Sequence, residues 1–379
     1  MPPSKAKFAI GRLSNTILKS GFLVVLSGLF VPLVIDAVAV SQTSPASRTP
    51  SPSPPMPSDP LELMKLARKT NGIVGGDAQP WHLKATYQVF ASDGKKSEDG
   101  VYEVFFADSR KYKQSFASKS FSQIDYTTDK GLFRMGDMQW ASGPERLIVK
   151  KLFHPLPNDD FLQKETPQAY DRNMGGANLH CVAFRSTMSE TTNSGATIPT
   201  FCFDHDKPIL RYTSGWGASY SELGGDTLMN EILVFHNHFV ARDVSVTMFD
   251  KLYVKIHVDT LEELAVVNDA DFYPPTTAAV APPPRPMVPY SIMNARIIKR
   301  VEPGHAALAN PSGWEGRVIV DLIVGSDGHV KRVRPLSGSS MYQGMVAGAV
   351  YKWIYTPFTV GNVPTEIETE VAYTFKPRT

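Results

Sequence analysis

Apolar and polar residues alternate in short segments along most of the chain between residues 82 and 260. Alternation with a period of two is typical of strands that bury one face. The segments are rich in Tyr, Phe and Val, and turn sequences such as Asp-Gly and Asp-Lys-Gly separate them. We therefore expect an antiparallel sheet with strands at residues 82–90, 100–108, 111–118, 121–129, 131–136, 178–186, 200–204, 208–214, 230–249 and 252–260.

Two segments break this alternation and carry helix signals. The first begins at Asp59, a capping residue, followed by Pro60, and it ends at the stop signal Asn71-Gly72. The second spans residues 144–153, where a proline begins the segment and apolar residues recur at helical spacing. We expect both helices to pack on the sheet.

The pattern changes twice more in the C-terminal part. Residues 316–338 alternate, turn at Gly325-Ser326-Asp327-Gly328 and alternate again, which predicts a β-hairpin. Helical spacing follows in residues 341–353, and a last strand at residues 365–375 alternates again. One face of this strand carries Ile367, Val371, Tyr373 and Phe375, which we expect to be buried. The other carries Glu366, Glu368 and Glu370, which we expect to be exposed.

Two stretches rich in proline and small residues, 41–58 and 274–289, divide the chain. Such a composition does not build a packed core, so we expect both to be extended, solvated linkers. They bracket a β-rich domain at residues 59–273 and leave a smaller domain at residues 290–379.

Residues 1–40 have the pattern of an export segment. Basic residues precede an apolar run at 21–35, and Ala-Val-Ala at 37–39 offers small residues to a signal peptidase. We expect cleavage there and an exported protein. An uncleaved inner-membrane anchor is the alternative, because extending the run to residue 40 gives about 20 residues, although Asp36 then lies within it.

Composition and motifs argue against several functions. The 379 residues are 42% hydrophobic and 20% charged, with a formal net charge of +2 and no dense basic block outside the N-terminus, so no nucleic-acid footprint is evident. The motifs GxSxG, HExxH, GxxxxGKS/T, GxGxxG and CxxC are absent from the sequence, so we expect neither an enzyme nor a cofactor. The strongest metal candidate is His236 and His238 on one face of a strand, with His205 as a third ligand. Exposed histidines are the simpler alternative, and we expect no metal.

The chain has two cysteines, Cys181 and Cys202, which lie in two predicted strands of an exported domain. An oxidising compartment favours a disulfide between them. Two separately buried thiols are the alternative.

A helix against a broad curved antiparallel sheet, with a second helix inserted, resembles the lipoprotein-carrier family typified by LolA. The segments FSQIDYTTDKGLFRMGD and TFCFDHDKPILR carry this resemblance together with the order of elements. The resemblance implies an α+β fold in which a half-barrel and helices enclose an apolar cavity for an acyl chain or a lipoprotein. The candidate cavity residues are Tyr87, Phe105, Phe121, Phe133 and Tyr253, although each is equally compatible with an ordinary core position.

The order hairpin, helix, final strand resembles the C-terminal domain of TonB energy-transducing proteins. The matching residues are Gly316 to Val324, Asp327-Gly328 with Val330, Ser337-Gly338, Trp353-Ile354-Tyr355 with Pro357, Gly361 and Phe375. The resemblance implies a small periplasmic α/β domain that binds the plug peptide of an outer-membrane TonB-dependent receptor by strand addition. The implied peptide-binding edge strand comprises Glu366, Ile367, Glu368, Thr369, Glu370, Val371, Ala372 and Tyr373.

Two departures from that family concern coupling to a proton-driven motor. The apolar run at 21–40 contains no histidine, and the two proline-rich linkers are short. We therefore expect a non-enzymatic envelope adaptor that contacts an outer-membrane transporter. The alternative is an acyl-chain carrier whose C-terminal domain is a docking module.

Overall fold

The structure is a computed structural model that describes residues 56–73, 79–91, 93–141, 143–164, 166–184, 198–215, 225–248, 251–304 and 316–375. All of these residues lie in one compact unit, residues 50–379. The predicted export segment and most of the first predicted linker lie outside the described residues.

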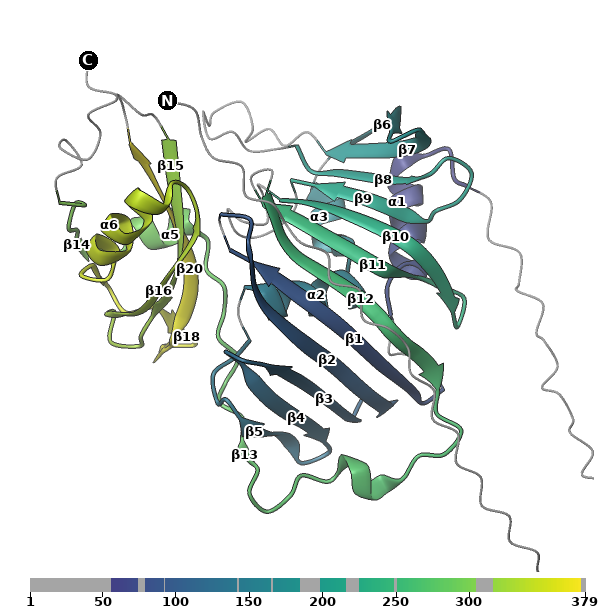
Figure 1. Cartoon of the computed structure of the whole chain (residues 1–379), viewed down its shortest axis with the longest axis horizontal. Coiled ribbons are helices and arrows are strands. Elements are labelled where there is room, and N and C mark those ends of the chain that lie inside the picture. The colour runs from purple at the N-terminus through teal and green to yellow at the C-terminus, as the bar shows by residue number, and fades with distance from the viewer. Residues whose placement is uncertain are drawn as a thin grey trace, which may run out of the picture. The chain divides into compact units, whose positions relative to one another are not determined.

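A 13-stranded antiparallel sheet dominates the larger part of the described chain (Figure 1). The order of strands across it is β13-β5-β4-β3-β2-β1-β12-β11-β10-β9-β8-β7-β6. The strands are β1 (Trp81–Phe90), β2 (Lys96–Asp108), β3 (Lys111–Ser118), β4 (Ser122–Thr128), β5 (Gly131–Gly136), β6 (Pro167–Met174), β7 (Ala177–Phe184), β8 (Thr200–Asp204), β9 (Leu210–Ser214), β10 (Gly225–Phe235), β11 (His238–Met248), β12 (Lys251–Glu263) and β13 (Ala279–Val280). The sheet curves without closing, as expected for a half-barrel.

Three helices cover one face of this sheet. They are α1 (Pro60–Thr70), α2 (Pro144–Phe153) and α3 (Asp159–Lys164). Apolar side chains of all three helices, such as Leu63, Leu147 and Leu162, share one buried core with the inward residues of the strands. The stacking of Trp81 on Phe106, with ring centroids 5.0 Å apart, lies in this core.

The predicted helix signals are confirmed. The side chain of Asp59 accepts a hydrogen bond from the Glu62 amide at 2.8 Å, and Pro60 is the first residue of α1. A capping carboxylate satisfies one of the four amides that a helix start leaves unpaired. The second helix begins at Pro144 and ends at Phe153, the predicted bounds.

One predicted strand is two strands in the structure. The segment 230–249 folds back at His236 and Asn237, where β10 ends and β11 begins. Both residues have positive φ, 47° and 62°, which is the requirement of a two-residue turn that matches the twist of a hairpin. Asparagine adopts this conformation readily, and the prediction overlooked that signal.

The disulfide is confirmed. Cys181 in β7 and Cys202 in β8 are directly opposite in the register of these strands, and their sulfur atoms are bonded. The bond lies in a small buried cluster beside Tyr212.

The C-terminal part contains a three-stranded antiparallel sheet in the order β16-β15-β20. Its main elements are β15 (Gly316–Val324), β16 (Val330–Ser337), α6 (Ser340–Val350) and β20 (Ile367–Phe375). Shorter elements are α5 (Tyr290–Asn294), β14 (Ile297–Lys299), β17 (Ile354–Tyr355), β18 (Thr359–Val360) and β19 (Val363–Pro364). The inward residues of the sheet and those of α6 form a second core, which confirms the predicted hairpin, helix and final strand.

The proline-rich segment 274–289 has many exposed residues, and parts of it also contact the large sheet. A 3₁₀ helix, η2 (Asp269–Phe272), precedes this segment. Within the segment, Ala279–Val280 form β13, which pairs with β5. The indole N–H of Trp140 donates to the carbonyls of Pro282 and Pro283, at 3.0 and 2.8 Å. Proline lacks an N–H but keeps its carbonyl, so a proline-rich chain still binds donors along a sheet edge.

Within the described residues, no helix combines the length and the apolar character needed to cross a bilayer.

Candidate functional site

Among the described residues, the final strand, β20, has a neighbouring strand of the sheet on one side only. On that side it pairs with β15, from Ile367 opposite Val324 to Phe375 opposite Gly316. The other side of β20 is therefore the edge of the three-stranded sheet. An edge offers main-chain donors and acceptors to an additional strand.

The first part of this edge already pairs with an extended segment of the same chain. The Glu368 amide donates to the carbonyl of Pro286 at 3.0 Å, and the Val288 amide donates to the carbonyl of Glu368 at 2.8 Å. These bonds form a parallel bridge between Met287 and Glu368. The edge of β20 thus has the geometry to accept an extended segment.

Alternation along the strand identifies the next positions on this edge. Neighbouring residues of a strand direct their N–H and C=O groups to opposite sides. Because Glu368 directs its groups away from β15, Glu370, Ala372 and Thr374 direct theirs to the same edge. These positions fall within or next to the predicted peptide-binding strand.

The predicted exposure of the glutamates is wrong for two of three. Glu368 and Glu370 are only 2% and 3% exposed, and the Glu366 side chain is 34% exposed. On the same face, Ile319 and Leu336 belong to the core of the larger domain. The face opposite α6 is therefore buried, because it packs against another layer of protein rather than against water.

Arginines balance the buried acids of this face. Arg146 of α2 forms an ion pair with Glu368 at 2.9 Å. Arg332 and Arg334 of β16 lie 3.6 and 3.4 Å from Asp321 of β15, which is 1% exposed. Buried charges persist in proteins when opposite charges of this kind compensate them.

Burial changes the protonation of this cluster. Burial, together with the adjacent carboxylate of Asp321, raises the pKa of Glu368 from 4.5 to about 7, against the opposing effect of Arg146. Burial also raises the pKa of Glu145 and raises the pKa of Tyr253 to about 12. The Glu368 carboxyl consequently titrates near neutral pH.

Deprotonation of Glu368 should lower the free energy of unfolding as the pH rises. A raised pKa means that the folded state binds the proton more tightly than the unfolded state, so the contribution is complete below about pH 4.5 and is lost as the pH rises to about 7. The other charges near Glu368 are those of Asp321, Arg146, Arg332 and Arg334.

We expect the Glu368→Gln variant to lose this part of the pH dependence. The measurement is the melting temperature of both proteins between pH 4.5 and 8, with Glu366→Gln as the control at a half-buried position. Melting temperatures of wild type and Glu368→Gln that change in parallel with pH contradict the assignment.

The predicted cavity residues are divided between two faces of the large sheet. Tyr87, Phe121 and Tyr253 belong to or pack against the core under the helices. Phe105 lies on the opposite face, where its ring stacks on His82 and the ammonium of Lys113 lies 4.8 Å from its centroid. By the register of β3 to β5, Phe133 shares that face with Lys113. Successive side chains of a strand point to opposite faces of the sheet, so aromatic residues that share a composition need not share a cavity.

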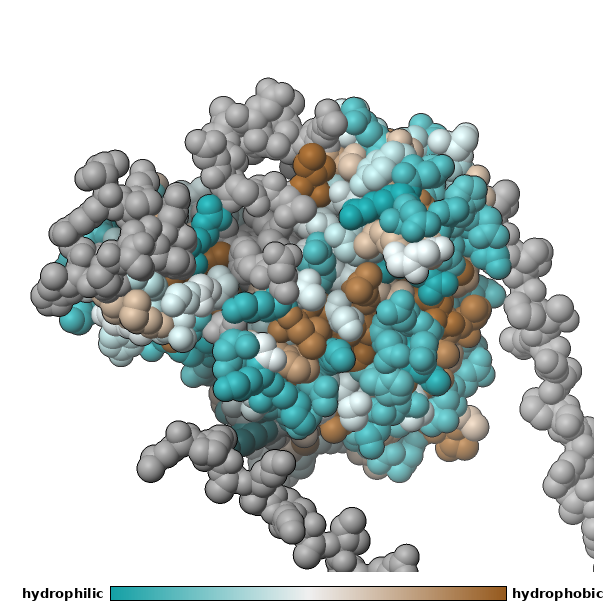
Figure 2. Space-filling model, turned by 45° about the horizontal axis from the view of Figure 1, so that its top comes forward, coloured by the Kyte–Doolittle hydropathy of each residue, from teal (hydrophilic) through white to brown (hydrophobic). Residues whose placement is uncertain are grey.

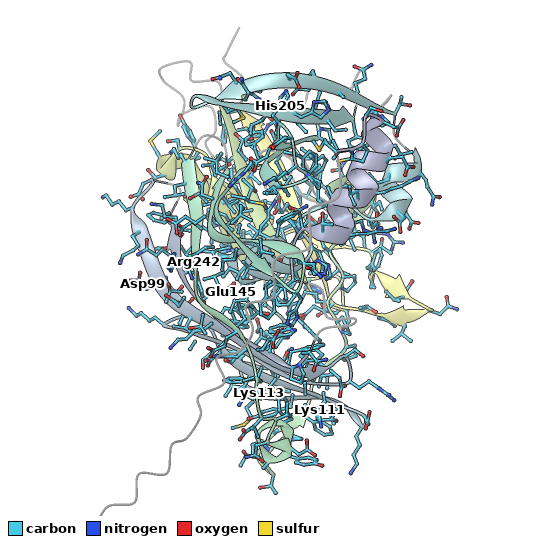
Figure 3. The ribbon with its side chains drawn as sticks, turned by 90° about the vertical axis from the view of Figure 1, so that its right-hand side faces the viewer. Asp99, Lys111, Lys113, Glu145, His205 and Arg242 are labelled. Carbon is cyan, nitrogen blue, oxygen red and sulfur yellow. A yellow bond between two sulfur atoms is a disulfide. The ribbon has the colours of Figure 1, made fainter. Side chains whose placement is uncertain are left out.

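The three candidate metal ligands do not converge. His205 is exposed in the turn after β8, whereas His236 belongs to the β10–β11 turn, where its Nε2 lies 2.8 Å from Glu263. Figure 3 shows His205 at the opposite end of the sheet from Lys111 and Lys113. Among the described residues, no three His, Cys, Asp or Glu side chains are grouped to hold a metal ion.

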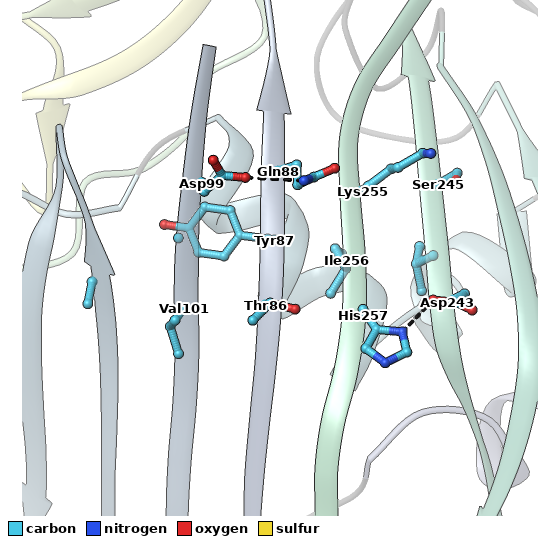
Figure 4. A pocket seen from close by; sticks show the side chains of 13 residues that line it. Thr86, Tyr87, Gln88, Asp99, Val101, Asp243, Ser245, Lys255, Ile256 and His257 are labelled. Atoms are coloured by element: carbon cyan, nitrogen blue, oxygen red, sulfur yellow. Dashed lines mark hydrogen bonds and ion pairs between the residues drawn. The ribbon is translucent and has the colours of Figure 1, made fainter. Parts of the chain in front are cut away.

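A groove of about 740 Å³ lies over β1, β2, β11 and β12 (Figure 4). Several of its polar side chains pair with each other: Gln88 donates to Asp99 at 3.1 Å, and the His257 ring lies 2.7 Å from Asp243. Figure 2 shows that polar and apolar residues are interspersed on the visible face of the molecule. Apolar side chains such as Val101, Val244 and Ile256 also line the groove, so its lining is mixed rather than uniformly apolar.

Comparison with known families identifies the C-terminal part. Residues 303–377 match the family described as the Gram-negative bacterial TonB protein C-terminal domain. This is a TonB-like domain. The match covers β15, β16, α6 and β20 and indicates a protein of the Gram-negative cell envelope. No protein of curated function matches the chain.

Solved structures resemble the larger part. A LolA superfamily protein from Nitrosomonas europaea has 8% identity and a TM-score of 0.36, with 56% of this chain and 96% of that chain covered. A DUF1329 family protein from Desulfovibrio piger has 11% identity and a TM-score of 0.31, with 56% and 95% covered. MucB has 10% identity and a TM-score of 0.27, with 59% and 64% covered. At these values none of the three carries a function to this chain.

The most completely buried ion pair among the described residues was not predicted from the sequence. Arg134 of β5 and Asp125 of β4 are each 1% exposed, and two hydrogen bonds of 2.6 and 2.7 Å join them. The two residues are nine positions apart on paired strands, where they face each other in the register. A basic and an acidic residue directly opposite in a predicted hairpin were the available signal.

Proposed function

We propose that the TonB-like domain binds an extended peptide of an outer-membrane TonB-dependent receptor by strand addition to β20. The observation that supports the proposal is the parallel pairing of the chain's own residues 286–288 with Glu368, in which main-chain groups on this edge bind an extended segment. The match of residues 303–377 supports a receptor peptide as the partner. The proposed binding residues are Glu366–Tyr373, continued along the same edge to Thr374.

The protein acts, in this proposal, as a non-enzymatic adaptor of the periplasm. Export through residues 1–40 places it there, with either a cleaved segment or an inner-membrane anchor. The larger domain then has a structural role, as the part of the protein to which the TonB-like domain is attached.

The alternative function, an acyl-chain or lipoprotein carrier, needs an apolar space between the helices and the sheet. The aromatic side chains on this face pack against one another instead: the rings of Tyr102 and Phe116 lie 4.5 Å apart, and those of Phe116 and Phe121 lie 5.8 Å apart. The adaptor function is therefore the better supported of the two.

The test is the binding of synthetic plug peptides, taken from the receptors of the same organism, to the purified full chain. Isothermal titration calorimetry measures the affinity, and peptides with the same composition in scrambled order are the control. Saturable binding of plug peptides with weaker binding of the scrambled ones supports the proposal. Absence of binding by every plug peptide contradicts it.

A further inference from the structure

The segment Arg285–Val288, which we call the cis strand, is held on the edge by three kinds of contact. Two main-chain hydrogen bonds join it to Glu368. The Arg285 guanidinium lies 2.8 Å from the Glu366 carboxylate through both Nε and a terminal nitrogen, and its side chain is 4% exposed. Val288 is 4% exposed and packs in the core of the TonB-like domain.

We propose that the cis strand competes with the peptide ligand for the edge of β20, and that the ligand has side chains of the same kind at the matching positions. This inference rests on the proposed function, because it concerns the same edge. The partner it fits is an extended peptide parallel to β20, with a basic residue facing Glu366 and an apolar residue three positions later in the place of Val288.

The cis strand binds the edge of β20 weakly, because one main-chain hydrogen bond of a parallel ladder is missing. In a parallel ladder the residue whose carbonyl accepts from Glu368 also directs its own N–H toward the carbonyl of Glu366. In the cis strand that residue is Pro286, which has no N–H. A peptide with another residue at this position therefore gains a hydrogen bond that the cis strand lacks.

Tethering compensates for this weakness. A segment on the same chain competes at a high effective concentration, so a free peptide binds with an affinity reduced by the fraction of molecules whose edge is open. Pro283 and Pro284 on one side are exposed, and the hydrogen bonds from Trp140 to the carbonyls of Pro282 and Pro283 anchor the chain directly before the cis strand. The Arg285–Glu366 ion pair is then the contact that holds the site closed.

The experiment measures binding of two labelled synthetic peptides to the full chain by fluorescence anisotropy. One peptide copies residues 281–290, and the other has alanine in place of Pro286. The chain variants are Arg285→Ala and Arg285→Gln, which remove the charge, with Arg285→Lys as the control that keeps it. Circular dichroism verifies that each variant is folded.

We expect both charge-removing variants to bind the copy peptide at least about tenfold more tightly than the wild type, and Arg285→Lys to stay close to the wild type. The alanine peptide should bind more tightly than the copy. Equal affinities of wild type and both variants overturn the inference.

Receptor plug peptides separate the two proposals. If they bind the wild type while the charge-removing variants bind neither the copy nor the plug peptides more tightly, the cis strand is a structural part of the domain and the proposed function stands. If no peptide binds any of the proteins, the proposed function fails together with the inference.

Discussion

Replacing Ala372 by proline is expected to weaken peptide binding at least about tenfold and to leave the domain folded. Ala372 pairs with Ile319 at a position where its own N–H points away from β15, toward the outer edge of the sheet. Proline there removes a donor for the peptide, and its ring obstructs an incoming strand. The pairing of β20 with β15 stays intact, because proline is tolerated where the N–H faces the edge.

The matched control is Ala372→Val, which adds side-chain volume at the same site and keeps the N–H. Ala372 packs against the core of the larger domain, so both variants report any cost of added volume there. Calorimetry with plug peptides should show near-wild-type affinity for valine and a large loss for proline. A folded Ala372→Pro protein that binds as tightly as Ala372→Val rules out strand addition at this edge.

Replacing Arg134 by leucine is expected to lower the free energy of unfolding by about 3–5 kcal/mol. The substitution leaves the carboxylate of Asp125, which is 1% exposed, without its bidentate partner. It also removes the hydrogen bond from the guanidinium to the carbonyl of Met138, at 3.1 Å, and the contact with the ring of Trp140 at 4.2 Å. Urea unfolding followed by fluorescence measures the change.

The double variant Asp125→Leu/Arg134→Leu distinguishes two effects: the loss of the ion pair itself, and the cost of leaving the Asp125 carboxylate buried without Arg134. An apolar replacement of a whole buried ion pair is often close to neutral, whereas removal of one partner is costly. We therefore expect the double variant to recover a large part of the loss. A single variant as stable as the wild type contradicts a structural role for the pair.

Local signals in the sequence were sufficient for some elements, such as α1, and for the disulfide. Asp59 and Pro60 determine the start of α1 because a capping carboxylate and an N-terminal proline are short-range requirements. The Cys181–Cys202 bond followed from two strand positions and an oxidising compartment. These inferences depend on few neighbours, so they need no knowledge of the packing between domains.

The candidate site depends on contacts between residues that are far apart in the sequence. The alternation of apolar and polar residues along a strand does not predict such contacts. Glu368 and Glu370 have the pattern of a solvated strand face, yet Arg146, more than 200 positions earlier, forms an ion pair with Glu368 where that face is buried. The same holds for Pro286 and Val288, whose composition predicts a solvated linker although their main chain pairs with Glu368. Edge pairing by main-chain groups leaves no side-chain pattern that a sequence displays.

Amide hydrogen exchange along β20 tests the central claim most directly. The full chain is measured by NMR with and without a plug peptide at saturating concentration. Strand addition predicts slower exchange of the Ala372 and Thr374 amides, which face the open edge, and little change at Val371 and Tyr373, which pair with β15. A peptide that binds without slowing exchange at Ala372 and Thr374 contradicts the account, because it then occupies another surface.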